Sequence, residues 1–168
     1  MAGRSHHAAD LRKGRVSLPG VCYFITTDVE RGCPPIPFPE GAELVIECWR
    51  WLRDHRRTWN GGYVVMDDHV HFLMLLREGF TLPRVLDSFK TYTATRINQI
   101  LGRKGIFWQE GYYDHAIRDE SDFWACLNYM HNNPVRRGWV ERPEDYAYST
   151  AHPSRADDID WEALGYSP

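Results

Sequence analysis

The pattern of apolar and polar positions divides the chain into regular elements of two periods. Residues 21–27 are β-branched and aromatic, which predicts a strand. Over residues 41–58 apolar side chains recur on one helical face, and the following Asn60-Gly-Gly62 predicts the end of that helix. Two further strands, 63–66 and 69–77, are predicted on either side of a tight acidic turn.

The second half of the chain continues this pattern. A second helix is predicted over residues 82–101, and the aromatic stretch 106–118 is predicted to be extended. The acidic run at 119–122 predicts the start of a third helix, which Pro134 must end near Asn133. The order strand, helix, strand, strand, helix, strand, helix predicts an α+β fold, a ferredoxin-like antiparallel sheet with helices packed on one face.

Length and composition favour one globular domain. The chain has 168 residues, of which 43% are hydrophobic and 14% aromatic, and this excludes a disordered chain or a coiled coil. No apolar run approaches the roughly 20 residues that cross a bilayer, and no signal peptide is evident, so we expect a cytoplasmic protein without a membrane partner. We expect one domain over residues 1–152 and an acidic C-terminal tail over 153–168.

Charge is unevenly distributed along the chain. The net charge of −3 gives no overall sign of nucleic-acid binding. Basic residues nevertheless outnumber acids between Thr81 and Gly105, whereas seven acids and two arginines lie between Glu141 and Pro168. Each run fits a binding surface or an ordinary solvated face.

The sequence His69-Val70-His71 is the first candidate for chemistry. Side chains two apart in a strand point to the same face, so the two imidazoles can share one cation while Val70 packs into the opposite face. Taken alone, the pair also fits two ordinary exposed histidines.

The third predicted helix offers a partner for these histidines. Tyr129 and Asn133 are four residues apart, so a phenol and an amide can face the same site. From the residues alone, Tyr129 also fits a rim aromatic and Asn133 a helix stop.

Four segments together resemble a known family. They are Asp67-Asp-His-Val-His-Phe72, Trp108-Gln-Glu-Gly-Tyr-Tyr-Asp-His-Ala-Ile-Arg118, Tyr129-Met-His-Asn-Asn-Pro-Val-Arg-Arg-Gly-Trp139 and Pro143-Glu-Asp-Tyr-Ala-Tyr-Ser149. In this order and spacing they resemble the single-tyrosine HUH transposases, specifically the REP-associated tyrosine transposase group. The resemblance covers roughly residues 15–152.

The resemblance implies a specific activity and site. It implies a metal-dependent single-stranded DNA endonuclease and strand transferase, which cleaves at hairpin or palindromic repeats through a covalent 5′-phosphotyrosine intermediate. It assigns His69, His71 and Asn133 as ligands of Mg²⁺ or Mn²⁺ and Tyr129 as the nucleophile. Metal neutralises charge on a phosphate under attack, and phosphate completes the shell of a weak Mg²⁺ site without carboxylates.

Candidate DNA contacts combine basic and aromatic side chains. They are Arg84, Lys90, Arg96, Arg103, Lys104, Trp108, Tyr113 and His115. About half of the aromatic residues near Trp108 are expected in the core, and His115 fits a structural hydrogen bond as well as a DNA contact. We hypothesise that the acidic residues past Tyr148 fold back near the basic surface and compete with DNA.

Two other functions stay open at this stage. A non-catalytic regulator that binds hairpin or single-stranded DNA would keep the fold, although intact His69, His71, Tyr129 and Asn133 argue against it. A metal hydrolase would need a carboxylate near the histidines, and a turn already explains the acids that precede them. The resemblance to the REP-associated group favours a monomer over a homodimer.

Overall fold

The computed structural model describes residues 17–167, so the first 16 residues of the predicted domain lie outside the described part. The larger elements are β1 Cys22–Asp28, α1 Glu40–Asp54, β2 Thr58–Val65, β3 His69–Leu76, α2 Leu82–Ile100, β4 Tyr113–Ala116, α3 Glu120–His131, α4 Asn133–Arg136 and α5 Trp161–Leu164. Two short 3-10 helices, Pro143–Asp145 and Pro153–Asp158, lie between α4 and α5. None of the described helices combines the length and apolar character that crossing a membrane requires.

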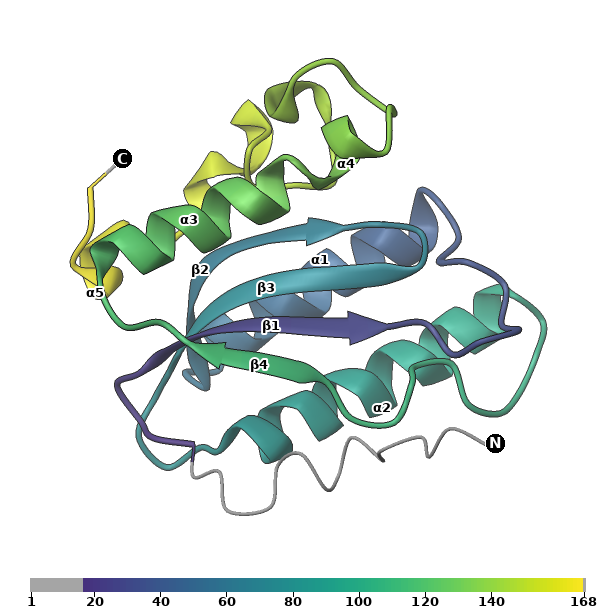
Figure 1. Ribbon diagram of the computed structural model, residues 1–168. Helices are drawn as coiled ribbons and strands as arrows, with labels where there is room; N and C mark the ends of the chain where they lie inside the picture. Colours follow the sequence, from purple (N-terminus) through teal and green to yellow (C-terminus); the bar gives the residue numbers. More distant parts are fainter. Residues whose placement is uncertain (1–16, 168) are drawn as a thin grey trace, which may run out of the picture.

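The strands form one antiparallel sheet with the order β2-β3-β1-β4 (Figure 1). The two central strands are β1 and β3, and their register places Thr26 opposite His71 and Asp28 opposite His69. This arrangement confirms the predicted α+β fold with an antiparallel ferredoxin-like sheet.

Both faces of the sheet are covered, which corrects the prediction that all helices share one face. The helices α1 and α2 cover one face, where Trp49 and Phe89 pack against Phe72 of β3. The helix α3 covers the other face, where Phe123 and Leu127 belong to a separate core (Figure 1). The reason is that β1 and β3 contain continuous apolar runs, Cys22–Ile25 and Phe72–Leu76, and are buried at nearly every position, which is the pattern of strands covered on both sides.

The segment Asn60-Gly-Gly62 belongs to β2 and does not form the predicted break. A register shift between Asn60 and Gly62 marks a bulge. The backbone N–H of Asn60 donates a hydrogen bond to the Asp160 carboxylate at 2.7 Å. Gly62 has φ +133° and lies against α3, where a side chain would collide with Met130. The bulge therefore allows α3 to approach the sheet closely.

The third helix ends slightly earlier than predicted. Asn132 caps α3 with helical angles, and α4 starts at Asn133 with Pro134 in its first turn, where proline is tolerated. The chain therefore keeps a nearly helical course past the proline, and Asn133 stays next to the last turn of α3.

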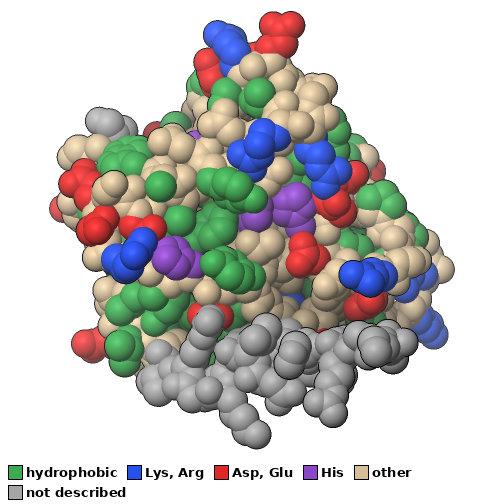
Figure 2. Space-filling model, in the orientation of Figure 1, with side chains coloured by type: hydrophobic (Ala, Val, Ile, Leu, Met, Phe, Trp, Pro, Cys, Tyr) green, Lys and Arg blue, Asp and Glu red, His purple; other side chains and the backbone are tan. Residues whose placement is uncertain are grey.

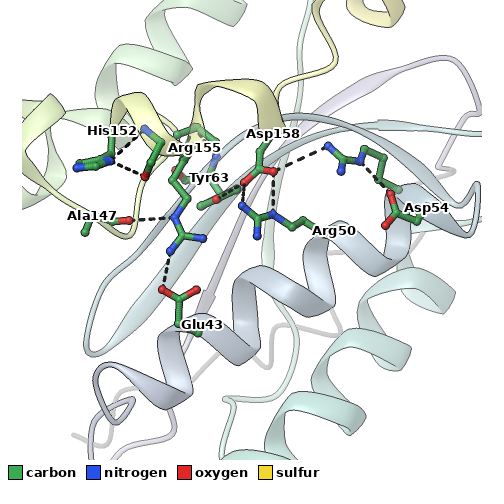
Figure 3. A network of polar contacts seen from close by, with 11 residues as sticks. Glu43, Arg50, Asp54, Tyr63, Ala147, His152, Arg155 and Asp158 are labelled. Carbon is green, nitrogen blue, oxygen red and sulfur yellow. Dashed lines mark hydrogen bonds and ion pairs between the residues drawn. The ribbon is translucent and has the colours of Figure 1, made fainter.

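The acidic segment after His152 packs on the sheet and on α1. The Asp158 carboxylate accepts hydrogen bonds from Arg50 of α1 and from Tyr63 of β2 (Figure 3). Ile159 is buried in the core on the α3 side of the sheet. The acidic segment thus contributes to the packing, and its role as a tail that competes with DNA stays a prediction.

Candidate functional site

Strand alternation directs two histidines to the α3 side of the sheet. Val70 and Phe72 of β3 point into the α1–α2 core and are fully buried. His69 and His71 therefore point to the opposite face, and their ring centroids are 4.7 Å apart.

The His71 ring is held in one orientation by contacts to its Nδ1 and to its ring face. Its Nδ1 shares a 2.8 Å hydrogen bond with Thr26 Oγ1, and its ring stacks on Phe24 at 5.1 Å between centroids. Burial, together with the nearby His69, lowers the pKa of His71 to about 3, so its imidazole is neutral at pH 7. Within residues 17–167 its Nε2 is buried without a hydrogen-bond partner, so this nitrogen is available to bind a ligand in the cavity.

His69 is oriented by an acidic neighbour. Its Nδ1 donates to Asp68 Oδ1 at 2.6 Å, and its Nε2 lies 3.1 Å from the amide nitrogen of Asn133. Burial alone would raise the pKa of Asp68, but hydrogen bonds from Arg137 and His69 hold it below its usual value. A charged Asp68 keeps the proton on His69 Nδ1 and leaves Nε2 facing Asn133.

Tyr129 stands beside the histidines on the last turns of α3. Asp119 is the N-cap of this helix, and its side chain accepts a hydrogen bond from the Asp122 backbone N–H at 2.9 Å. The apolar stripe of the helix is buried on the sheet. Tyr129 is 52% exposed, and its ring meets the His71 ring edge-on at 5.7 Å. The Arg136 guanidinium lies over the same ring, 4.3 Å from its centroid.

These groups open into one cavity of about 810 Å³. Its lining residues are Phe24, Thr26, Asp28, His69, His71, Tyr113, His115, Ala125, Cys126, Tyr129, Asn133, Arg136 and Arg137. Figure 2 shows histidine side chains near the middle of this face, with basic side chains above them. The cavity thus combines two imidazoles, an amide, a phenol and guanidinium groups.

The predicted basic DNA contacts do not line this cavity. Arg84, Lys90 and Arg96 belong to α2, which covers the opposite face of the sheet, and Arg103 and Lys104 follow it. Several of these side chains fix local structure: Lys90 donates to the carbonyls of Gln109 and Gly111, and Arg103 donates to Asn98 at 2.9 Å.

Trp108 lies in the core. Its ring is 4% exposed, and its indole N–H donates to Thr93 Oγ1 at 2.9 Å. This leaves no free ring face for a base, because the ring packs among Phe89 and Phe107. The aromatic stretch around Trp108 covers the end of α2 as an irregular segment, and only Tyr113–Ala116 forms a strand.

Tyr113 and His115 do line the cavity, at the β4 edge. Tyr113 is 59% exposed, and His115 Nε2 lies 2.9 Å from Asp122 Oδ2. His115, Asp122 and Cys126 offer ligand atoms that all lie within 4.8 Å of one another. The pKa of Asp122 is lowered to about 2, mainly by hydrogen bonds from the Arg118 backbone and side chain and to a smaller extent by the hydrogen bond with His115. We interpret this cluster as the structural tie between β4 and α3.

Four residues of the site have no role in the sequence-based prediction. Thr26 and Asp68 orient the histidines, and Arg136 and Arg137 line the cavity. Asp68 and both arginines lie in the segments that carry the family resemblance, so the sequence could have indicated that they belong to the site. Thr26 depends on the β1–β3 register, which no local pattern reveals.

Comparison with known proteins shows which class of protein this chain resembles. The family model described as "Transposase IS200 like" matches residues 55–133, a range that contains both histidines, Tyr129 and Asn133. The matched range is just under half of the chain, and over that range the chain is similar to these transposases.

Two curated relatives to which the chain is similar are described as REP-associated tyrosine transposases. It is 32% identical over 93 residues to the REP-associated tyrosine transposase of Escherichia coli K12, a match covering 54% of this chain and 52% of the relative. It is 31% identical over 120 residues to a Haemophilus influenzae protein described as a REP-associated tyrosine transposase, covering 62% of this chain and 65% of the relative. The matches thus span about half to two thirds of these relatives.

A solved structure supports the fold over the whole chain. A REP-associated tyrosine transposase bound to a REP hairpin superimposes with a TM-score of 0.69 and 22% sequence identity. The superposition covers 100% of this chain and 89% of that protein.

Proposed function

We propose that this protein is a metal-dependent transposase that cleaves single-stranded DNA beside a hairpin and transfers the cut strand. The observation that carries the proposal is the convergence of a phenol, two imidazoles and an amide on one open cavity. These groups come from β3 and from the consecutive helices α3 and α4, and more than 40 residues separate β3 from α3 in the sequence. The similarity of residues 55–133 to the transposase family model supports the same proposal.

The donor set fits a divalent cation, Mg²⁺ or Mn²⁺. His71 has the proton on Nδ1 when it donates to Thr26, and its partnerless Nε2 then offers a lone pair. His69 offers Nε2 in the same way, since Asp68 takes its Nδ1 proton. The Asn133 amide can present its oxygen after rotation, because oxygen and nitrogen occupy equivalent positions about its terminal bond. A bound cation would neutralise charge on the phosphate and leave coordination positions for it.

In the proposed step Tyr129 acts as the nucleophile. Its phenol oxygen attacks the scissile phosphorus, a bond forms between that oxygen and phosphorus, and the bond from phosphorus to the 3′ oxygen breaks. The phenol loses its proton to solvent, and the departing 3′ oxygen takes up a proton. The result is a 5′-phosphotyrosine and a free 3′ hydroxyl, so a second 3′ hydroxyl can reverse the step and join a new strand.

The substrate follows from the shape of the site. A phosphate can reach Tyr129 only where the strand is splayed from its partner, and exposed Tyr113 offers a ring for stacking an unpaired base. A hairpin with a single-stranded flank meets both needs, and a related transposase has been solved with a REP hairpin. We assign the first DNA contacts to Tyr113 and His115. DNA would reach the basic residues of α2 only by passing around the β4 edge.

The oligomeric state follows from the same residues. His69, His71, Tyr129 and Asn133 of one chain lie around one cavity, so one chain is sufficient for a complete site. We therefore propose a monomer.

A denaturing-gel assay tests this function. The protein is incubated with Mn²⁺ and labelled single-stranded hairpins taken from the repeats flanking its own gene. The wild type should form a protein-linked product that Tyr129→Phe cannot form. Tyr92→Phe, which removes the hydroxyl of an exposed tyrosine on α2 outside the cavity, is the matched control and should keep the product.

Two results would refute the proposal. Hairpin binding without any covalent product, under Mg²⁺ and Mn²⁺, would indicate a non-catalytic DNA-binding regulator. Cleavage that survives in Tyr129→Phe would indicate a nuclease that uses water as the nucleophile.

A further inference from the structure

Two adjacent arginines line the cavity, but their surroundings differ. Arg137 donates to Asp68, and its guanidinium also lies 3.8 Å from Asp67. Its charge is therefore compensated, and it supports the orientation of His69 through Asp68. Within residues 17–167 the Arg136 guanidinium has no hydrogen bond or ion pair, and its contact is with the Tyr129 ring. Arg136 is thus the uncompensated fixed positive charge in the described lining of the cavity.

The position of Arg136 follows from the helical course of the chain. Tyr129, Asn133 and Arg136 are spaced by four and three residues, which places them on one side of a continuous helical path. The path continues through α4, because the Arg136 amide donates to the Asn132 carbonyl at 3.0 Å. Asn133 and Pro134 are buried and hold α4 in place. One segment therefore carries the nucleophile, the amide and the free guanidinium.

We propose that Arg136 binds the scissile phosphate and positions the Tyr129 ring, an inference that rests on the function proposed above. A guanidinium can stack on an aromatic ring with its face and donate to phosphate oxygens with its edge. Arg136 already stacks on Tyr129 at 4.3 Å, so its N–H groups are available next to the nucleophile. An ammonium group offers a point charge without this planar fork, so lysine cannot replace both functions.

The proposed role matches the charge that develops in the reaction. As the phenol oxygen bonds to phosphorus and the 3′ oxygen departs, negative charge increases on the two non-bridging oxygens. The His71 ring lies edge-on to the Tyr129 ring, whereas the Arg136 guanidinium lies over the face of the Tyr129 ring. Arg136 therefore supplies fixed positive charge from a second direction. Removal of such a donor from a reaction site lowers the rate by about 100-fold.

Single-turnover cleavage measures this contribution. The substrate is the hairpin oligonucleotide that the wild type cleaves, and the rate of protein-linked product is followed at saturating DNA. Arg136→Ala should be about 100-fold slower, and Arg136→Lys should recover only part of the rate. Arg142→Ala is the matched control: its guanidinium is exposed, pairs with Asp145 outside the cavity and should leave the rate unchanged. An Arg136→Ala rate within twofold of wild type would overturn the proposal.

A modified substrate separates phosphate binding from support of the tyrosine ring. A methylphosphonate at the scissile position replaces one non-bridging oxygen by a neutral methyl group. If Arg136 contacts that phosphate, Arg136→Ala should lose much less rate on the methylphosphonate than on the normal substrate. An equal loss on both substrates would mean that Arg136 only supports Tyr129, and the phosphate-binding proposal would be wrong.

Binding without metal tests Arg136 independently of cleavage. If the wild type forms no covalent product with any hairpin, the proposed function fails, and Arg136 is then judged by its affinity for DNA. A short single-stranded thymidine oligonucleotide in EDTA should bind Arg136→Ala about tenfold more weakly than wild type or Arg142→Ala. Equal affinities of all three proteins would overturn the phosphate contact.

Discussion

Replacement of Asp158 by alanine should destabilise the fold measurably. The carboxylate is 8% exposed and accepts two hydrogen bonds from Arg50, both at 2.7 Å, and one from the Tyr63 hydroxyl at 2.6 Å (Figure 3). A second guanidinium, from Arg53, lies 4.0 Å away. Alanine would remove every one of these acceptor contacts and leave the buried Tyr63 hydroxyl without a partner.

The magnitude follows from the burial of the partners. Breaking a buried ion pair by removing one partner costs about 3–5 kcal/mol, because the other charge is left uncompensated. The Arg50 side chain is 34% exposed and can turn toward water, so the lower end applies, about 3 kcal/mol in the free energy of unfolding. For a chain of 168 residues each kcal/mol lowers Tm by about 2–4 °C, which gives a decrease of about 6–12 °C.

Urea unfolding followed by tryptophan fluorescence measures this loss. The matched control is Asp145→Ala, which removes an exposed carboxylate that pairs with Arg142 and should leave the unfolding midpoint unchanged. The double variant Arg50→Ala, Asp158→Ala should be more stable than the sum of the single losses predicts. If Asp158→Ala is as stable as Asp145→Ala, the network of Figure 3 does not stabilise the C-terminal segment, and our reasoning is refuted.

Three further predictions address the site and its support. Thr26→Val should raise the Mn²⁺ concentration needed for covalent product about tenfold, because the hydrogen bond that orients His71 is lost; an unchanged requirement would contradict this. Gly62→Ala should cost about 2 kcal/mol more in urea unfolding than Gly79→Ala, because both have positive φ but only at Gly62 would a methyl group clash; equal costs would exclude the packing effect. Burial and the hydrogen bond to Asp158 raise the pKa of Tyr63, so the free energy of unfolding should decrease as the pH rises above about 10, where the tyrosine of the unfolded chain ionises. Unfolding measured at pH 9 and 11 should show a smaller decrease in Tyr63→Phe than in the wild type.

Local periodicity was sufficient to predict part of the site. A period of two placed His69 and His71 on one face, and a helical spacing placed Tyr129 near Asn133. Both patterns depend only on residues close together in the sequence, so the predicted faces stay correct even when the predicted ends of a strand or helix are wrong by a few residues. The roles of these residues stay predictions until the cleavage assay is made.

Non-local packing was not available from the same patterns. An apolar stripe shows that α3 buries a face, but it does not say which side of the sheet receives it. The apolar run Phe72–Leu76 was the missed signal, because strands covered on one side only alternate with polar residues. Trp108 and Lys90 show the same limit, since an aromatic or basic side chain near a helix end fits a core or a loop contact as well as a DNA contact.

The division of the site between β3 and α3 has a consequence for amide hydrogen exchange. His69 and His71 lie on a strand paired on both sides, so their backbone amides exchange only when the sheet unfolds. The helix α3 is held by one apolar stripe and by the C-terminal segment, so its amides can exchange through local opening. Such an opening would separate Tyr129 from the histidines while the sheet stays intact. The proposed set of reacting groups therefore comes together only in the docked state of α3, and the stability of that docking sets the fraction of molecules in which the cavity has all of them.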